Sequence, residues 1–466
     1  MRLYNTQSQS IEIFKSINPG VVTLYTCGPT VYSSPHIGNM RAYVHADLLK
    51  SVLTDEGFKV KHVINITDVG HLTSDADEGD DKMENQAQKE GVKSFMIAEK
   101  YEQEFIENLD SLAIQKPQYM PRATEYIQEQ IDFIKTLEEK GYTYNTSDGV
   151  YFDTSKISNY ADIAKIDKDG IIEGFRVYMG EKRNGTDFAL WKFSPLDKQR
   201  DMEWESPWGK GFPGWHIECS AMAKSLLGKH IDIHTGGVDH IHVHHAAEIA
   251  QSTAAHEHTM ANYWSHVNFL STDEKMSKSK GNIITVKHLE EAGFSPMVLK
   301  YFYYLSHYRS ELSFDMAFDN LKKAKNAYEN LHQRAIELDK DSGAGEIDDE
   351  IVQAFKDILR DDLNTPKALA YLFTTLKQGD INPATKLQLM KVADKILKLN
   401  LFIVNNVEIP EDIQAMANER WEAKQNKDWE KADELRKLID NKGFIIKDTR
   451  EGFLIEKNNN KGCIKY

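Results

Sequence analysis

The stretch from Val21 to Lys50 constrains the fold more than any other part of the chain. An apolar run of β-forming residues, Val21 to Tyr25, comes first, and turn residues follow it. A helical pattern then extends from Met40 to Leu53. A buried strand, a turn and a helix in this order predict the opening unit of a nucleotide-binding α/β domain.

Three residues of this stretch have side chains or conformations suited to chemistry. Cys27 follows the strand, and a cysteine there is either a soft metal ligand or nucleophile, or a small buried apolar side chain. His36 lies at the predicted helix N-terminus, where backbone N–H groups and the helix dipole attract phosphate. Gly38 lacks a side chain, so a base or ribose can approach the backbone closely.

Length and composition predict a soluble protein of several domains. A chain of 466 residues is too long for one core, so we expect roughly two to four domains. The sequence has no apolar run of about 18 residues and no N-terminal basic segment followed by an apolar one, which predicts neither secretion nor a membrane anchor. Three cysteines exclude a disulfide scaffold and fit a reducing compartment, so we expect a cytoplasmic location.

The charge is distributed unevenly along the chain. A net charge of −15 taken alone argues against a nucleic-acid partner. Residues 411–466, however, hold 12 acidic and 12 basic side chains, so the whole acidic excess precedes them. Such a neutral tail, rich in Lys and Arg, is compatible with a polyanion, but charge alone favours a solvated helix face.

Strand and helix patterns divide the chain into segments. They predict an α/β class, with a Rossmann-type catalytic domain, an inserted domain, a helical bundle and a small α+β C-terminal domain. The predicted ranges are 1–115 and 213–265 for the two halves of the Rossmann domain, 116–212 for the inserted connective domain, 266–318 for a junction, 319–404 for the bundle and 411–466 for the C-terminal domain.

Periodicity predicts further elements inside these domains. The expected helices are 82–112, 124–140, one beginning near His244, about four between 319 and 404, and a single long one over 411–441. The expected strands are 59–66, 149–153, 188–193, 231–234, 283–286, 444–447 and 452–457. The segment Trp204–Trp215, rich in Trp, Gly and Pro, is expected to be an ordered loop.

A second cysteine and a histidine-rich segment suggest a metal site. Cys219 lies far from Cys27 in sequence, and His244 and Glu248 share one face of a predicted helix because they are four residues apart. Two thiolates, an imidazole and a carboxylate suit tetrahedral zinc. His242 and His245 compete with His244 for the ligand role, and a metal-free cluster of histidines is the alternative.

Two charged loops remain to be interpreted. The acidic residues 74–81 resemble a calcium loop but lack its full ligand spacing, so a solvated loop is expected. In the basic loop Lys275–Asn282, Lys275 and Lys278 supply point charges that suit a β,γ-phosphate pair, and an exposed basic turn is the alternative.

The sequence HIGN at 36–39, followed by KMSKS at 275–279, resembles the paired signature of class I aminoacyl-tRNA synthetases. The fourth letter of the first motif, usually His, is Asn39 here. With Cys27 and the segments GWHIECSAM, DIHTGGVDH and HHAAEIAQ, the chain resembles the cysteinyl-tRNA synthetase family along nearly its whole length. The expected fold is therefore that of a class I synthetase catalytic domain followed by tRNA-binding helices.

The resemblance implies a role for each matching residue. One zinc ion per chain would be bound in the amino-acid pocket by Cys27, Cys219, His244 and Glu248. The residues implied to line or adjoin the amino-acid substrate are Thr67, Trp215 and Asp239. Those implied to contact ATP are Gly38, Gly236, Gly237 and Lys278, and those implied to act on its phosphates are His36, Asn39, Lys275 and Lys278.

The same resemblance implies the reaction and its partners. ATP, accompanied by Mg²⁺, would activate L-cysteine to cysteinyl-adenylate, and the acyl group would pass to the 3′ end of tRNA(Cys). Zinc would select the thiol so strongly that no editing domain is needed. We expect a monomer with no membrane partner.

The sequence differs from the usual family pattern in two places, and three other functions compete with this interpretation. The acidic loop is longer than in many members, and Ala246 and Ala247 stand where Glu and Asn are usual. The nearest rival is a cysteine ligase with a small-molecule acceptor, an amino-sugar thiol precursor, but such relatives lack an extended tail. A non-catalytic zinc- and RNA-binding regulator would have lost the signature motifs, and a plain nucleotidyltransferase would not need Cys219 or Glu248.

Overall fold

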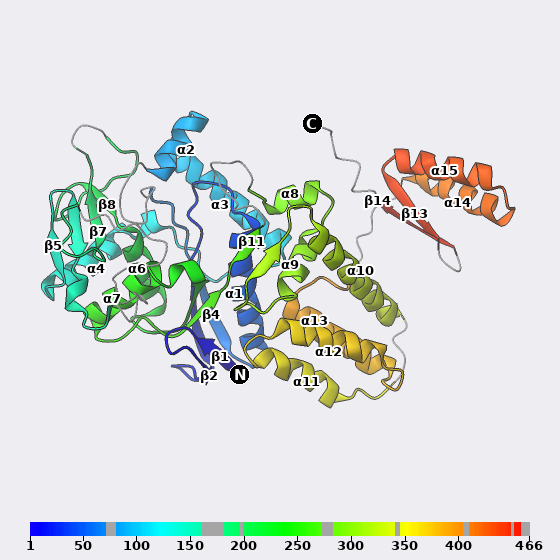
Figure 1. Ribbon diagram of the computed structural model, residues 1–466, viewed down its shortest axis with the longest axis horizontal. Helices are drawn as coiled ribbons and strands as arrows, with labels where there is room; N and C mark the ends of the chain where they lie inside the picture. Colours follow the sequence, from blue (N-terminus) through cyan, green and yellow to red (C-terminus); the bar gives the residue numbers. More distant parts are fainter. Residues whose placement is uncertain are drawn as a thin grey trace.

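The computed structural model describes residues 1–70, 81–160, 180–195, 199–272, 283–340, 345–403, 410–448 and 452–457. Its centre is a parallel sheet of four strands in the spatial order β10 (Ala261–Val267), β9 (Ile231–Gly237), β3 (Val21–Thr26) and β4 (Lys59–Ile64) (Figure 1). The chain leaves β3 toward β4 and later returns to β9 on the other side of β3. The carboxyl ends of β3 and β9 therefore form a topological switch point, where open α/β sheets bind their ligands.

The residues of the sheet explain its burial. All of β3 except Val21 is buried, as expected for a strand covered on both faces. Asp232, buried in β9, accepts hydrogen bonds from the backbone N–H and the hydroxyl of Thr23, both at 2.7 Å, and joins the two strands. A short antiparallel hairpin, β1 (Arg2–Asn5) and β2 (Ser10–Ile13), packs beside β10.

Helix α1 (Ile37–Asp55) follows β3 and packs against β4, β9 and the helical bundle. After β4 the sequence predicts one helix over 82–112, but the structure has two, α2 (Lys82–Glu90) and α3 (Ser94–Ser111). Gly91 ends α2 with φ +68°, a left-handed conformation that glycine adopts without strain. The helical period continues across this break, which is why the pattern alone does not reveal it.

The inserted unit is an antiparallel sheet covered by helices, on the left of Figure 1. Helix α4 (Ile127–Glu139) follows the 3₁₀ turn η1 (Ala123–Tyr126), and a second 3₁₀ turn, η2, spans Thr154–Lys156. The strands pair in chain order and are β5 (Thr143–Asn145), β6 (Gly149–Phe152), β7 (Phe188–Phe193) and β8 (Gly211–Pro213).

Two helices connect the inserted unit to the central sheet. They are α6 (Trp215–Leu227) and α7 (His244–His256), and both pack against α4. Ile217, Ala221 and Ala250 lie in one core with side chains of the inserted sheet. The 3₁₀ turn η3 (Val238–His240) precedes α7. The expected loop over 204–215 is only partly correct, since β8 lies within it and α6 begins at its last residue.

The chain after β10 forms a small parallel pair, β11 (Leu270–Thr272) with β12 (Leu312–Phe314). Helices α8 (Val286–Glu291) and α9 (Pro296–Tyr304) lie between these strands in sequence. The predicted strand over 283–286 is wrong, because Thr285 caps the N-terminus of α8 in a reciprocal pair with His288. A threonine at this position supplies the acceptor that the first helical N–H groups need.

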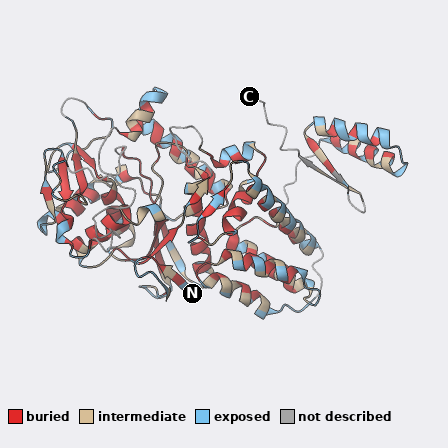
Figure 2. Cartoon of the chain, in the orientation of Figure 1, coloured by how far each residue is buried: buried red, intermediate tan, exposed pale blue. Residues whose placement is uncertain are grey.

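Within its described residues, the stretch that the sequence predicts as helical contains four helices that pack as a bundle. Figure 2 shows their inner faces buried and their outer faces exposed. The helices are α10 (Asp319–Lys340), α11 (Asp349–Arg360), α12 (Thr365–Lys377) and α13 (Pro383–Leu397). Asp47 of α1 binds partly exposed Lys398 at the end of α13 at 2.6 Å and fully buried Lys300 of α9 at 3.5 Å, so a buried carboxylate joins α1 to the bundle and to α9.

The C-terminal unit has its own small core, formed by Ile413, Ala417, Ile439, Phe444 and Ile446, and lies apart from the body in Figure 1. The predicted single helix over 411–441 is two helices that pack together, because the chain turns at residues 426–428 and Asp428 caps the second. The elements are α14 (Glu411–Gln425), α15 (Trp429–Asn441), β13 (Phe444–Asp448) and β14 (Phe453–Lys457). Among the described residues, no helix is both long and apolar enough to cross a membrane.

Candidate active site and metal centre

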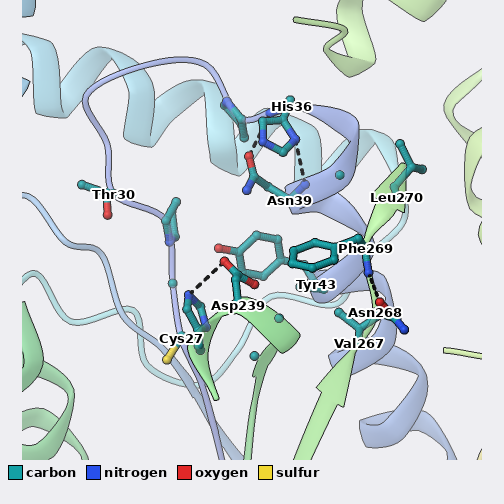
Figure 3. A pocket seen from close by; sticks show the side chains of 18 of the residues that line it. Cys27, Thr30, His36, Asn39, Tyr43, Asp239, Val267, Asn268, Phe269 and Leu270 are labelled. Carbon is teal, nitrogen blue, oxygen red and sulfur yellow. Dashed lines mark hydrogen bonds and ion pairs between the residues drawn. The ribbon is translucent and has the colours of Figure 1, made fainter. Parts of the chain in front are cut away.

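A cavity of about 800 Å³ opens at the carboxyl ends of β3 and β9, at the switch point of the sheet. Figure 3 shows His36 and Asn39 on one side, Cys27 and Asp239 on another, and the segment Asn268–Leu270 along a third. The predicted site residues that line it are Cys27, His36, Gly38, Asn39, Trp215, Gly236, Gly237 and Asp239. Four segments that are remote in sequence thus meet around one space.

His36 and Asn39 form a reciprocal cap on α1. The backbone N–H of Asn39 donates to Nδ1 of His36, and the backbone N–H of His36 donates to Oδ1 of Asn39, both at 3.2 Å. Because Nδ1 accepts, a neutral imidazole carries its proton on Nε2, which is then a donor. The cap therefore fixes the ring at a helix N-terminus, an environment suited to an anionic group.

Close packing requires glycine at positions 236 and 237. A Cβ at Gly236 would lie 2.6 Å from Nδ1 of His240 and 2.8 Å from Cε1 of His245. A Cβ at Gly237 would lie 2.2 Å from Oδ1 of Asp239. These glycines let the imidazoles and the carboxylate approach the end of β9, besides keeping the cavity floor open.

The four predicted metal ligands converge beneath the cavity. One donor atom from each of Cys27, Cys219, His244 and Glu248 lies within 4.8 Å of all the others, and all four residues are buried. Cys27 follows β3, Cys219 lies on α6, and His244 and Glu248 lie one turn apart on α7. The packing of α6 and α7 against the sheet thus brings together residues from three distant segments.

Glu248 is completely buried, and its near neighbours are imidazoles. Its Oε2 lies 3.0 Å from Nε2 of His234, and its Oε1 lies 3.5 Å from Nε2 of His244. Burial acts to raise the pKa of the carboxyl, but His234 and His244 outweigh it and lower the pKa below the ordinary value. Among the described residues, Lys and Arg make no ion pair with Glu248, so a buried negative charge has only imidazoles to balance it.

The two buried thiols, like Glu248, would be stabilised in their ionised form by a nearby positive charge. Burial and the neighbouring Cys219 raise the pKa of the Cys27 thiol well above its ordinary value. The pKa of Cys219 is also raised, by burial and by Glu248, although its contact with Cys27 opposes the change. A divalent cation among these groups would stabilise thiolates and carboxylate together, so the residues fit a zinc ion.

A second donor set overlaps the first. Cys27, His234, His245 and Glu248 also have donor atoms within 4.8 Å of one another. Nε2 of His245 lies 3.2 Å from Sγ of Cys27, and its Nδ1 lies 2.7 Å from Nε2 of His266. The competition between His244 and His245 that the sequence left open therefore has a structural basis.

Asn65, His234 and His266 are site residues that the sequence analysis missed. Oδ1 of Asn65 accepts from the backbone N–H of Gly28 at 2.8 Å and lies 3.6 Å from Sγ of Cys219, so Asn65 lies between the two cysteine segments. A Cβ at Gly28 would overlap the Asn65 carbonyl oxygen at 1.4 Å. The only signal in the sequence is position, since Asn65 directly follows β4, whereas His234 lies in the middle of β9.

Not every predicted site residue lines the cavity. Thr67 is buried, and its hydroxyl donates to Oε2 of Glu218 at 3.0 Å and accepts from the Asn65 amide. Its place is behind the site rather than on its wall. Lys275 and Lys278 lie outside the described residues, as does the acidic loop except for Asp81, which caps α2 and pairs with buried Arg200.

Comparisons with known proteins agree with this arrangement. A family model described as the tRNA synthetases class I (C) catalytic domain matches residues 13–326, and a DALR domain model matches residues 354–400. Cysteine--tRNA ligase 1 of Burkholderia lata is 46% identical over 97% of this chain and 96% of its own length. Cysteine--tRNA ligase of Chlorobaculum tepidum is 38% identical over 97% of this chain and 98% of its own length.

A solved structure shares the fold. The methionyl-tRNA synthetase of Mycobacterium tuberculosis, in complex with methionyl-adenylate, superposes with a TM-score of 0.56 and covers 81% of this chain and 90% of its own. At 14% identity this likeness concerns the fold alone. It confirms the predicted architecture, a Rossmann-type α/β catalytic domain of class I synthetases followed by helices.

Proposed function

Because the chain belongs to the cysteine--tRNA ligase family of class I aminoacyl-tRNA synthetases, we propose that its cavity activates cysteine with ATP above a zinc centre. The overall activity is the ATP-dependent charging of tRNA with cysteine. The observation that carries the proposal is one cavity with the α1 N-terminus on one side and Cys27, which belongs to the buried donor set, on another.

The phosphate side of the cavity is assigned to His36, Gly38 and Asn39. In the activation step a carboxylate oxygen of cysteine forms a bond to the α-phosphorus of ATP while the bond to pyrophosphate breaks. Negative charge develops on the phosphate oxygens, and the Nε2–H of His36 and the α1 N-terminus are oriented to stabilise it. Lys275 and Lys278 are proposed to bind the pyrophosphate, with Mg²⁺ accompanying ATP, and Gly38, Gly236 and Gly237 to admit the adenosine.

The amino-acid side is assigned to the buried centre and its rim. We propose that Cys27, Cys219, His244 and Glu248 hold one zinc ion, with Trp215 and Asp239 beside the substrate. Zinc supplies a Lewis acid that binds thiolate in preference to hydroxyl, which serine cannot match. Trp215 packs 4.6 Å from the His244 ring, between centroids, and thereby holds that imidazole against Glu248.

The transfer step requires tRNA(Cys), and the bundle and the C-terminal unit are proposed to hold it. The alternative of a small-molecule acceptor is not favoured, because the relatives named cysteine--tRNA ligase match nearly the full chain, the region of the C-terminal unit included. We propose a cytoplasmic location, since a reducing compartment keeps Cys27 and Cys219 as thiols. The monomer remains a proposal from the sequence.

Amino-acid-dependent ATP–pyrophosphate exchange tests the proposal directly. Measured with each of the twenty amino acids, exchange should depend on cysteine and remain at background with serine and alanine. Zinc content of the purified protein should be close to one ion per chain. Exchange with several amino acids, or full exchange in metal-free protein, would contradict the assigned site.

A further inference from the structure

Arg41 is a buried cation on α1, one turn after the His36–Asn39 cap, and it is only 2% exposed. Its guanidinium donates four hydrogen bonds, all to backbone carbonyls. Nη1 donates to the carbonyls of Asn268 at 2.8 Å and Phe269 at 2.7 Å. Nη2 donates to those of His307 at 3.3 Å and Ser310 at 2.9 Å.

A buried arginine normally pairs with a carboxylate, and Arg41 does not within the described part of the chain. Burial lowers its pKa to about 10, which still leaves the side chain charged at neutral pH. Among the described residues, its hydrogen-bond partners are backbone carbonyls, whose dipoles stabilise the charge. The planar guanidinium, with donors directed along fixed lines, suits this use because it holds several acceptors at set angles.

Two of the four acceptors of Arg41, the carbonyls of Asn268 and Phe269, belong to residues in a wall of the active-site cavity. Asn268, Phe269 and Leu270 line the cavity, and Phe269 remains 53% exposed toward it (Figure 3). The backbone N–H of Asn268 also donates to the Tyr308 carbonyl at 2.8 Å, so the wall and the 307–310 turn form one unit. Arg41 joins that unit to the helix that carries the phosphate side of the cavity.

Ile37 makes a second connection between α1 and later residues of the chain. The backbone N–H of Ile37 donates to the Ile284 carbonyl at 2.9 Å, and its own carbonyl accepts from the Tyr303 hydroxyl at 2.5 Å. The first turns of α1 are therefore bonded to the chain on both sides of residues 273–282, through Arg41 to Asn268, Phe269, His307 and Ser310, and through Ile37 to Ile284 and Tyr303.

We propose that Arg41 is a positioning residue for ATP: it fixes the distance between the Asn268–Phe269 wall and the first turn of α1. The inference rests on the proposed placement of the nucleotide between these two surfaces. The cysteine end of the cavity depends on Cys27, Trp215 and Asp239, which Arg41 does not contact. Loss of Arg41 should therefore affect ATP and cysteine differently.

The test compares Arg41→Gln and Arg41→Lys with the wild type in cysteine-dependent pyrophosphate exchange. We expect Arg41→Gln to raise KM for ATP about tenfold or more, because charge-assisted hydrogen bonds are lost, while KM for cysteine changes less than about twofold. Arg41→Lys should give an intermediate KM for ATP, since one ammonium reaches fewer carbonyls. The dissociation constant of a non-hydrolysable ATP analogue should move in parallel, and zinc content should not change.

Lys300→Met is the matched control, because Lys300 is also a buried cation that donates to backbone carbonyls, those of Leu112 at 2.9 Å and Ala113 at 3.1 Å. Neither acceptor lines the cavity. This variant should alter thermal stability and leave KM for ATP unchanged.

The proposal is overturned if Arg41→Gln raises both KM values alike, or lowers stability with KM for ATP unchanged. If Arg41→Gln does not fold, the KM values of Arg41→Lys for ATP and for cysteine provide the same test. Failure of the proposed function would look different, since the wild type itself would then show no cysteine-dependent exchange.

Discussion

The sulfur of Cys27 lies 3.2 Å from Nε2 of His245, although helical spacing selects the neighbouring His244 as the partner of Glu248. Both imidazoles lie beside the same carboxylate, His244 at 3.5 Å from Oε1 and His245 at 3.9 Å from Oε2. The centre thus contains two overlapping donor sets that share Cys27 and Glu248. Metal measurements on variants can separate them.

Replacing Cys219 tests the set that contains both thiols. Cys219→Ser should lose zinc and cysteine-dependent exchange together, because a hydroxyl is a far weaker zinc ligand than a thiolate. Metal analysis of the purified protein and pyrophosphate exchange measure the two losses. Cys463→Ser, a substitution outside the described residues, is the matched control and should keep both properties. Retention of zinc by Cys219→Ser would favour the second donor set.

The two histidines should differ in their effect on metal binding. His244→Gln should remove zinc at ordinary chelator concentrations, because His244 is proposed as a direct ligand. His245→Gln should keep one ion per chain but bind it about 10- to 100-fold more weakly, as expected when a residue that orients a ligand is lost. Competition with a chromophoric chelator gives both affinities. The reverse order would make His245 the ligand and His244 the supporting residue.

The C-terminal unit should be needed for transfer but not for activation. Its core, with Ile413 and Ile439 at its centre, is made of its own side chains, so removing residues 411–466 should leave the catalytic core folded. The truncated protein should keep pyrophosphate exchange within about twofold and lose most tRNA charging, because phosphate contacts supply much of nucleic-acid affinity. Acylation of tRNA at rising salt provides a second measurement. Undiminished charging by the truncated chain would contradict the proposed role.

Buried Lys300 should make stability depend on pH. Burial lowers its pKa to about 8, whereas an unfolded lysine titrates near about 10.4. Between these values the unfolded chain binds a proton that the folded chain does not, so the free energy of unfolding should rise with pH, by up to about 1.4 kcal/mol per pH unit. Below about pH 8 both states are protonated, and Lys300 adds no slope.

Urea denaturation of the wild type and of Lys300→Met, from about pH 7 to about pH 10, isolates this contribution. The difference between the two proteins should be flat below about pH 8 and change in favour of the wild type above it. Lys300→Met is thus used both here and as the control for the KM measurements with ATP. A difference that stays constant over the whole range would mean that Lys300 keeps its proton when folded.

The strands and the bundle were predictable because their patterns are local. β3, β6 and β7 begin and end within one residue of the predicted ranges, and the four helices of the bundle have regular apolar faces. The breaks at Gly91 and at residues 426–428 were not predicted, because the helical period runs through both. Helix α6 was missed for another reason: residues 216–223 are all buried, the polar His216, Glu218 and Ser220 included, so polar side chains do not mark an exposed face there.

The site was predictable in part from side-chain chemistry. Soft and acidic donors suggested a metal set, and the structure brings its four members together. The contributions of Asn65, His234 and His266 depend on which strands are adjacent, which the sequence alone does not specify. Thr67 was predicted to lie beside the amino-acid substrate, but in the structure it packs behind the site against Glu218.

The order of the donors along the chain has a consequence for how the protein matures. Cys27 is made early, but Glu248 is made only after the whole inserted unit, and the donors share a centre only once α6 and α7 pack on the sheet. Synthesis proceeds from the N-terminus, so the ribosome must release α7 before all four groups can hold the proposed ion. Until then the Cys27 thiol of the nascent chain has neither burial nor the proposed metal to protect it from oxidants.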